Sequence, residues 1–291
     1  MAPLVGSGVW FGSTGNARGI FALGGTASPT TNTYTYSNNA VATGTNLTAD
    51  SEYGAAAGNS TLGIFAIGYN GDTASPTTNT YTYSNNGVTT GTNLTTDLYA
   101  GAAAGNSTLG IFVIGNNGSS YIIITNIYAY ANNGVTTGTN LTASVNGGAA
   151  TGNSTLGIFA IGNDTVTTNI YTYSNNAVAT GTNLTADSEN EAAAGNSTLG
   201  IFALGYSGGT ASPTTNTYTY SNNAVATGTN LTADSNVGAA TGNSTLGIFA
   251  IGNDTVTTNI YTYSNNAVAT GTNLTAYSNG GSAASTTPGG F

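Results

Sequence analysis

Short apolar segments recur along the chain at a nearly constant interval. The triplet Gly-Ile-Phe begins at residues 19, 63, 110, 157, 200 and 247, so its spacings are 44, 47, 47, 43 and 47 residues. Self-similarity at a fixed period of this length is typical of repeat architectures. Residues 148–186 and 238–276 are identical at all 39 positions, which indicates a recent duplication within the chain.

Each repeat has the hydrophobic pattern of four short β-strands. In the second repeat, residues 54–58 are small, residues 63–68 are apolar enough to be buried on both sides, and residues 80–84 alternate in the manner of a half-buried strand. Residues 85–87 (Asn-Asn-Gly) predict a turn, because Asn and Gly tolerate a positive φ. Residues 88–94 predict the last strand. Four strands in about 45 residues match one blade of a β-propeller.

The predicted fold is therefore all-β, a six-bladed β-propeller with four antiparallel strands per blade. The blades are expected at about residues 8–48, 53–95, 100–142, 147–185, 190–232 and 237–275. The first-strand pattern occurs seven times, at residues 8–14 and again at 282–287 among others, although a six-bladed ring needs only six copies. Because the first copy carries Val9, Trp10 and Phe11, we expect it to lie in the ring, within a propeller spanning residues 1–281. Residues 282–291 are then a C-terminal arm, or else the ring-closing strand.

Three segments of the repeat resemble a known family. Residues 19–25 (GIFALGG) resemble the second strand of a Kelch repeat, the Tyr-x-Tyr that follows resembles the third strand, and Thr-Gly-Thr-Asn-Leu resembles the fourth. The resemblance covers essentially the whole chain and implies a Kelch-like propeller. It departs from the Kelch pattern in two respects, because the Gly doublet that ends the second strand occurs only at Gly24-Gly25, being Gly-Tyr or Gly-Asn in the other repeats, and the fourth strands carry no Trp. The repeats are also similar to the Ala/Gly/Thr-rich Kelch-like repeat proteins of tailed bacteriophages.

Composition limits the chemistry that the chain can perform. It has one basic residue (Arg18), ten acidic residues, a net charge of −9, and no His or Cys. Binding to nucleic acid needs several cations to neutralise phosphates, so we expect no nucleic-acid partner. No apolar run reaches transmembrane length, so we expect no membrane insertion. Without His, Cys or Lys the chain lacks nucleophile–base pairs, Schiff-base chemistry and most metal ligands, so we expect no enzymatic activity, no metal and no cofactor.

The charges sort by loop type. In a propeller, loops between strands two and three and loops from strand four to the next blade share one face, and the other two kinds of loop share the opposite face. All the acids fall in loops of the first kind and form a candidate outward acidic face: Asp50, Glu52, Asp72, Asp97, Asp164, Asp187, Glu189, Glu191, Asp234 and Asp254. The length differences between repeats fall in the loops between strands two and three, where variable binding residues are usually carried.

The opposite face is predicted to be uncharged apart from Arg18 and constant in length. Its turns between strands three and four each contain an Asn pair, and these pairs form a candidate docking face: Asn38, Asn39, Asn85, Asn86, Asn132, Asn133, Asn175, Asn176, Asn222, Asn223, Asn265 and Asn266. Amide side chains can form hydrogen bonds with a partner without the cost of desolvating ions.

Twelve of the 18 tyrosines form Tyr-x-Tyr pairs, one pair in each repeat. Residues at i and i+2 of a strand point to the same side of the sheet. An aromatic platform for sugars is one interpretation, and packing between neighbouring blades is the other. Recurrence in every repeat favours packing.

These observations lead to three hypotheses of function. The first is a non-enzymatic structural or binding protein of a phage virion, fibre-associated or a capsid decoration protein, made in the host cytoplasm and released by lysis. Its partners would be other virion proteins or copies of itself, with neutral glycans as a further possibility. The second is a bacterial cell-surface or carbohydrate-binding propeller located outside the cell. The third is an intracellular Kelch-type adaptor.

Overall fold

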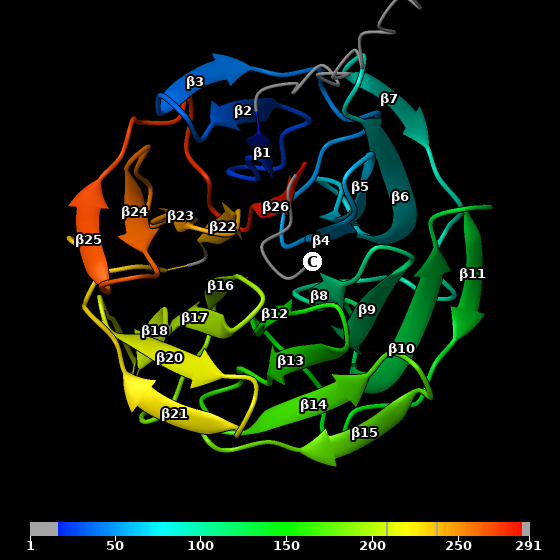
Figure 1. Cartoon of the computed structure of the whole chain (residues 1–291). Coiled ribbons are helices and arrows are strands. Elements are labelled where there is room, and N and C mark those ends of the chain that lie inside the picture. The colour runs from blue at the N-terminus through cyan, green and yellow to red at the C-terminus, as the bar shows by residue number, and fades with distance from the viewer. Residues whose placement is uncertain (1–16, 208, 237, 287–291) are drawn as a thin grey trace, which may run out of the picture.

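Six four-stranded antiparallel sheets form a closed ring in the computed structural model (Figure 1). The structure describes residues 17–286 except residues 208 and 237. These residues contain no helix, and therefore no helical segment that could cross a membrane. The prediction of a six-bladed β-propeller with four antiparallel strands per blade is confirmed.

Each blade runs from an inner strand at the axis to an outer strand at the rim. The inner strands of blades 1 to 6 are β26 (Ser282–Ser285), β4 (Ala55–Gly58), β8 (Ala102–Gly105), β12 (Ala149–Gly152), β16 (Ala192–Gly195) and β22 (Ala239–Gly242). The second strands are β1 (Arg18–Ala22), β5 (Leu62–Tyr69), β9 (Leu109–Asn116), β13 (Leu156–Ala160), β17 (Leu199–Ala203) and β23 (Leu246–Ala250). The third strands are β2 (Thr31–Thr35), β6 (Ala74–Thr82), β10 (Tyr121–Ala129), β14 (Thr168–Thr172), β20 (Thr215–Thr219) and β24 (Thr258–Thr262). The outer strands are β3 (Ala40–Thr43), β7 (Gly87–Thr90), β11 (Gly134–Thr137), β15 (Ala177–Thr180), β21 (Ala224–Thr227) and β25 (Ala267–Thr270). Blade 5 also carries a short ribbon, β18 (Tyr206–Ser207) with β19 (Thr210–Ala211).

The C-terminal strand closes the ring. β26 pairs antiparallel with β1, with Gly19 opposite Ser285 and Ala22 opposite Ser282. The expectation that the first copy of strand one fills this slot is therefore wrong, and residues 8–14 themselves lie outside the described residues. The inner strands contact one another around the axis, and this crowded position suits the small side chains of β26 better than those of Trp10 and Phe11.

The hydrophobic core lies between blades. One cluster joins Ile20 of blade 1 to Phe65, Ile67 and Tyr81 of blade 2, and the other clusters likewise combine residues of neighbouring blades. The first Tyr of every pair is fully buried and the second is 5% exposed. The tyrosine pairs are therefore packing between blades and not a sugar platform. Such burial contributes about 25 cal/mol per Å2 of apolar surface.

Two strand boundaries of blade 2 differ from the sequence prediction by four residues or more, and the others by at most two. The third strand of blade 2 begins at Ala74, because the hairpin with β5 continues past a bulge between Ala66 and Gly68. The outer strand β7 ends at Thr90 and not at residue 94. Beyond it the chain turns inward, and Leu94 is buried while its amide donates a hydrogen bond to the Pro76 carbonyl.

Candidate functional site

A buried asparagine links each blade to the preceding one. The Asn79 side chain in β6 accepts a hydrogen bond from the Thr48 amide at 2.6 Å and donates one to the Thr48 hydroxyl at 2.9 Å. In the other blades an equivalent Asn side chain accepts the same hydrogen bond from a backbone amide of the preceding blade. These residues are Asn32, Asn126, Asn169, Asn216 and Asn259. All six are fully buried. Sequence analysis missed this inter-blade link, although a Thr-Asn pair before each Tyr-x-Tyr is a visible signal.

The Asn pairs of the candidate docking face are turn residues. The first Asn accepts a hydrogen bond from the amide two residues on, as Asn85 does from Gly87 at 2.8 Å. The second Asn takes a positive φ, which is 57° at Asn86. Each first Asn side chain is exposed. The turns therefore owe their constant shape to the Asn side chains, while the amide nitrogens of the first Asn remain at the surface.

The loops between strands one and two lie at the same end of the blades and are also held by side chains. The Asn59 Oδ1 accepts hydrogen bonds from the Thr61 amide, the Thr61 hydroxyl and the Leu62 amide, at 2.8 to 3.0 Å. The Asn59 amide group also donates to the Ser107 carbonyl of the next blade at 3.1 Å. A loop with this many side-chain bonds cannot change its residues freely. Arg18 lies at this end of β1, and its guanidinium donates to the Tyr83 carbonyl of blade 2.

The loops at the opposite end of the blades are bridged to one another by backbone hydrogen bonds. Some of their turns are also held by side chains, such as Asn70, whose Oδ1 accepts hydrogen bonds from two nearby backbone amides. The Ser28 and Ser51 backbones bond to each other at 3.2 and 3.4 Å, and so do the Glu52 and Tyr69 backbones at 2.9 and 2.7 Å. Equivalent bridges recur around the ring, for example between Thr165 and Ser188. These bridges bring the loops between strands two and three together with the loops that enter each blade. Because the bridges themselves are between backbones, they do not depend on which side chains the bridged residues carry.

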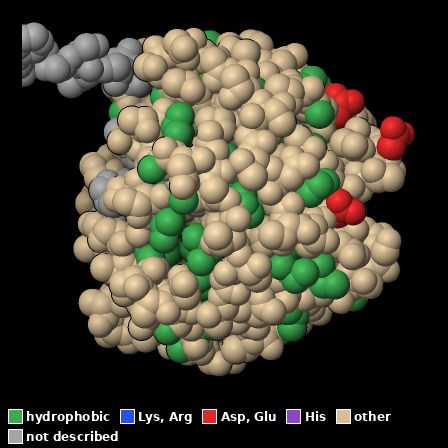
Figure 2. Space-filling model, turned by 90° about the vertical axis from the view of Figure 1, so that its right-hand side faces the viewer, with side chains coloured by type: hydrophobic (Ala, Val, Ile, Leu, Met, Phe, Trp, Pro, Cys, Tyr) green, Lys and Arg blue, Asp and Glu red, His purple; other side chains and the backbone are tan. Residues whose placement is uncertain are grey.

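The acidic side chains lie on these backbone-bridged loops. In the side view of the ring, the visible acidic side chains gather at one edge (Figure 2). Glu52 and Glu189 are half-buried, and desolvation raises the pKa of both carboxyl groups. The exposed acids are Asp50, Asp72, Asp97, Asp164, Asp187, Asp234 and Asp254. No group of three acids that could hold a metal occurs among residues 17–286, leaving aside positions 208 and 237.

Glu191 departs from the expectation of an outward acidic residue. Its side chain is 6% exposed, and it lies at the start of the inner strand of blade 5, where the other five blades have Gly. The Ser188 hydroxyl lies within hydrogen-bond distance of Oε1, and Oε2 has no hydrogen-bond partner. Burial raises the pKa of this carboxyl group to about 8. Glu191 is therefore mostly protonated at neutral pH, and it adds little charge to the face that the other acids share.

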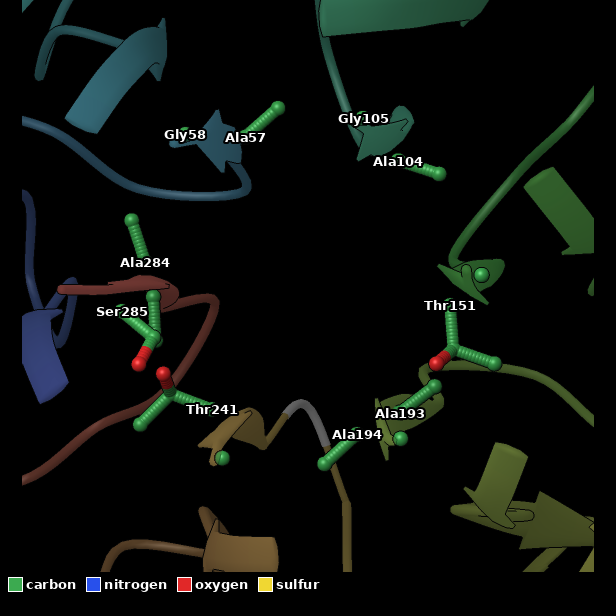
Figure 3. Close-up of a pocket in the computed structure, with 14 residues that line it drawn as sticks. Ala57, Gly58, Ala104, Gly105, Thr151, Ala193, Ala194, Thr241, Ala284 and Ser285 are labelled. Atoms are coloured by element: carbon green, nitrogen blue, oxygen red, sulfur yellow. The ribbon is translucent and has the colours of Figure 1, made fainter. Parts of the chain in front are cut away.

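The axis of the ring is an open channel lined by small side chains. Figure 3 shows the mouth on the side of the Asn turns, where Ala57, Ala104, Thr151, Thr241 and Ala284 surround a cavity of about 110 Å3. At the other mouth, Tyr53 and Glu191 are the large side chains among glycines around a cavity of about 40 Å3. A water molecule needs roughly 10–15 Å3 of such space, so this mouth has room for a few waters.

Six tyrosines lie outside the repeated pairs, and all are in the acidic loops or at the strand ends that adjoin them: Tyr53, Tyr69, Tyr99, Tyr121, Tyr206 and Tyr277. Tyr121 and Tyr277 are 61% and 54% exposed. Tyr53, Tyr69 and Tyr99 form a cluster over blade 2. Sequence analysis did not single out these six residues, although each falls in the same loop classes as the acids.

No family model matches the chain, and no curated protein matches it either. The fold therefore rests on the six blades described above, and the function rests on the chemistry of the two faces.

Proposed function

We propose that this chain is a non-enzymatic binding propeller that presents its acidic loops to partners and docks through its Asn-rich face. The acidic face comprises the loops between strands two and three and the loops entering each blade. The constant face means the turns at the opposite end. The observation that carries the proposal is the difference between the two faces. The acids, the tyrosines outside the Tyr-x-Tyr pairs and the differences in loop length all occur on the acidic face.

A surface of this kind suits recognition. Residues that bind partners are usually carried on variable loops above a rigid scaffold. The backbone bridges, such as that between Glu52 and Tyr69, fix the acidic loops without specifying their side chains. Tyrosine supplies a large contact area at low conformational cost, and it is enriched at binding sites for that reason. The acids repel anionic partners within a Debye length of about 8–10 Å, so uncharged partners such as neutral glycans, or cationic ones, are favoured.

The constant face suits attachment to a larger particle. The first Asn of each pair is exposed at the same place in every blade, so a partner or a second copy would meet the same amide group six times around the ring. Burying amide groups against hydrogen-bonding partners avoids the cost of burying ions. The docking partner in this proposal is another virion protein or a copy of the same chain.

The setting that we favour is the virion of a tailed phage, as a fibre-associated or decoration protein. The support is the similarity of the repeats to Kelch-like repeats of phage proteins, together with a nearly cation-free surface. A second candidate is a carbohydrate-binding propeller at a bacterial cell surface, which the exposed Tyr121 and Tyr277 favour. An intracellular Kelch-type adaptor ranks third, because adaptor surfaces usually carry charged residues of both signs.

Mass spectrometry of particles from the source of this gene tests the setting. Virions are purified on a density gradient, and the chain is quantified across the gradient beside a capsid protein. The proposal predicts that the chain follows the capsid protein at a constant ratio. Recovery of the chain only with cell envelopes would support the second candidate and contradict the virion assignment.

A further inference from the structure

Three tyrosines from separate segments of the chain meet on the acidic face beside a carboxyl group. The rings of Tyr53 and Tyr99 lie 4.9 Å apart at an interplanar angle of 35°, and the rings of Tyr69 and Tyr99 lie 6.2 Å apart at 87°. All three side chains are half-buried and so keep part of their surface open to solvent. Tyr69 and Tyr99 are nearly perpendicular and form a corner, and Tyr53 stacks against Tyr99 at a tilt.

Glu52 supplies a negative charge at this corner. Its backbone bonds directly to that of Tyr69, at 2.7 and 2.9 Å. Its charge raises the pKa of the Tyr53 and Tyr99 hydroxyl groups, after the larger effect of burial, so the carboxyl group is electrostatically coupled to both rings. The carboxylate accepts a backbone hydrogen bond from Ala27 and keeps further acceptor capacity.

The cluster is not part of the repeated scaffold. The positions equivalent to Tyr99 in the other blades are Glu52, Asn146, Glu189, Asn236 and Asn279. The positions equivalent to Tyr53 are Ala, Gly, Asn, Val and Gly in sequence order, and those equivalent to Tyr69 are mostly Asn or Gly. The other blades hold their loops with the same backbone bridges, and none of them combines the three rings, since blade 5 has only Tyr206 at the position of Tyr69. Blade closure therefore does not explain why three aromatic side chains gather at one place.

We propose that Tyr53, Tyr69, Tyr99 and Glu52 form a binding site for an organic ammonium group, with a methylated ammonium as the best-fitting class. The electron-rich faces of Tyr rings attract cations within about 6 Å, and aromatic cages with a nearby carboxylate suit quaternary ammonium ligands. The net charge of −9 adds a long-range attraction for cations and none for anions. This assignment rests on the proposed role of the acidic face in recognition, and it names the ligand of that face.

The experiment compares choline with 3,3-dimethylbutan-1-ol, which has nearly the same shape and no charge. Binding to the full chain is followed by NMR chemical-shift titration at low salt. We expect choline to bind and the uncharged analogue to bind at least about 5-fold more weakly, in line with the strength of cation–π contacts. Equal binding of the two compounds, no binding of choline, or tighter binding of a neutral sugar would overturn the proposal.

Variants that introduce the residue found at the equivalent position of another blade are expected to fold, because the scaffold already accommodates that residue. Tyr99→Asn and Tyr69→Asn restore residues that the scaffold already carries at equivalent positions, and Glu52→Gln removes the charge alone. Each is expected to weaken choline binding by about 3-fold to 30-fold, while thermal melting confirms that the ring is intact. Glu189→Gln is the matched control, since Glu189 occupies the position of Glu52 in blade 5 without the Tyr53 and Tyr99 rings. Loss of choline binding in this control as large as in Glu52→Gln would contradict the site.

The possible sources of the ammonium group are separated by two further ligands. Phosphocholine represents a headgroup on a surface polymer or lipid, and N-acetyl-Nε-trimethyl-lysine methylamide represents a modified protein side chain. The tighter ligand identifies the source. These titrations use only the isolated chain, so their failure would leave the virion test unaffected, and absence of the chain from virions would leave the titrations unaffected.

Discussion

The turns of the constant face repeat almost unchanged from blade to blade, whereas the loops of the acidic face differ in length, charge and aromatic content. The two sets of loops end the same strands, so the difference does not come from the sheets. On the constant face, Asn59 and Asn85 hold the turns with their side chains. On the acidic face, the loops are bridged by backbone bonds such as those between Ser28 and Ser51, and side chains such as Asn70 hold only some of the turns.

This comparison shows where a duplicated scaffold can diverge. A loop fixed by its side chains loses stability when those side chains change, because the orphaned backbone groups must find other partners. A loop fixed through its backbone tolerates new side chains. The acidic face could therefore acquire Tyr53, Tyr69, Tyr99 and its acids while the blades stayed the same.

The largest expected effect comes from Glu191, the one acidic residue on this face that is buried. Its pKa is raised from 4.5 to about 8 in the folded chain, so the folded state binds this proton more tightly than the unfolded state. The resulting stability is fully present below about pH 4.5 and is lost as the pH rises to about 8. Relative to Glu191→Gln, the wild type should lose on the order of 4 kcal/mol of unfolding free energy over that range.

Urea unfolding at a series of pH values measures this difference, and comparison with Glu191→Gln removes the effect of general charge repulsion. Asp187→Asn in the same loop is the control, because the Asp187 side chain is exposed. A difference between wild type and Glu191→Gln that does not change with pH would show that the carboxyl group is not buried as described.

The inter-blade asparagine gives the next largest effect. Asn79→Ala removes the acceptor of the Thr48 amide and the donor to the Thr48 hydroxyl, and it should lower the unfolding free energy by about 2–3 kcal/mol. Asn46→Ala changes an exposed side chain two residues before Thr48 and should cost less than about 0.5 kcal/mol. Chemical denaturation checks both values, and equal costs would remove the structural role given to Asn79.

A matched pair of variants tests the two faces directly. Asn59→Ala on the constant face removes an acceptor of three local hydrogen bonds and should cost about 1–2 kcal/mol. Asp72→Asn on the acidic face changes an exposed side chain and should stay within about 0.5 kcal/mol of the wild type. Thermal melting of the two variants side by side gives the comparison. A larger loss for Asp72→Asn would mean that the acidic loops are not held by their backbone.

The sequence was sufficient to predict the number of blades and strands, because the Gly-Ile-Phe period and the alternation around Tyr-x-Tyr are local signals. It did not reveal that β26 closes the ring. The first-strand copy with large side chains and the copy with small side chains both fit the repeat pattern, and only the crowding of the inner strands at the axis favours the small ones. The burial of Glu191 was missed because it depends on the local path of one loop. The meeting of Tyr53, Tyr69 and Tyr99 was missed because these residues are isolated in the sequence and come together only through the backbone bridges.

Single-cysteine labelling most directly tests the claim that the acidic face is free for recognition and the constant face docks. The chain has no Cys, so Asn38→Cys and Asp72→Cys each create one thiol for a bulky polyethylene glycol maleimide. Each labelled protein is added to particles produced without the chain, and its incorporation and its choline binding are measured. The account predicts that the label at residue 38 blocks incorporation and spares choline binding, while the label at residue 72 spares incorporation and weakens choline binding. Blocked incorporation with the label at residue 72 and normal incorporation with the label at residue 38 would contradict it.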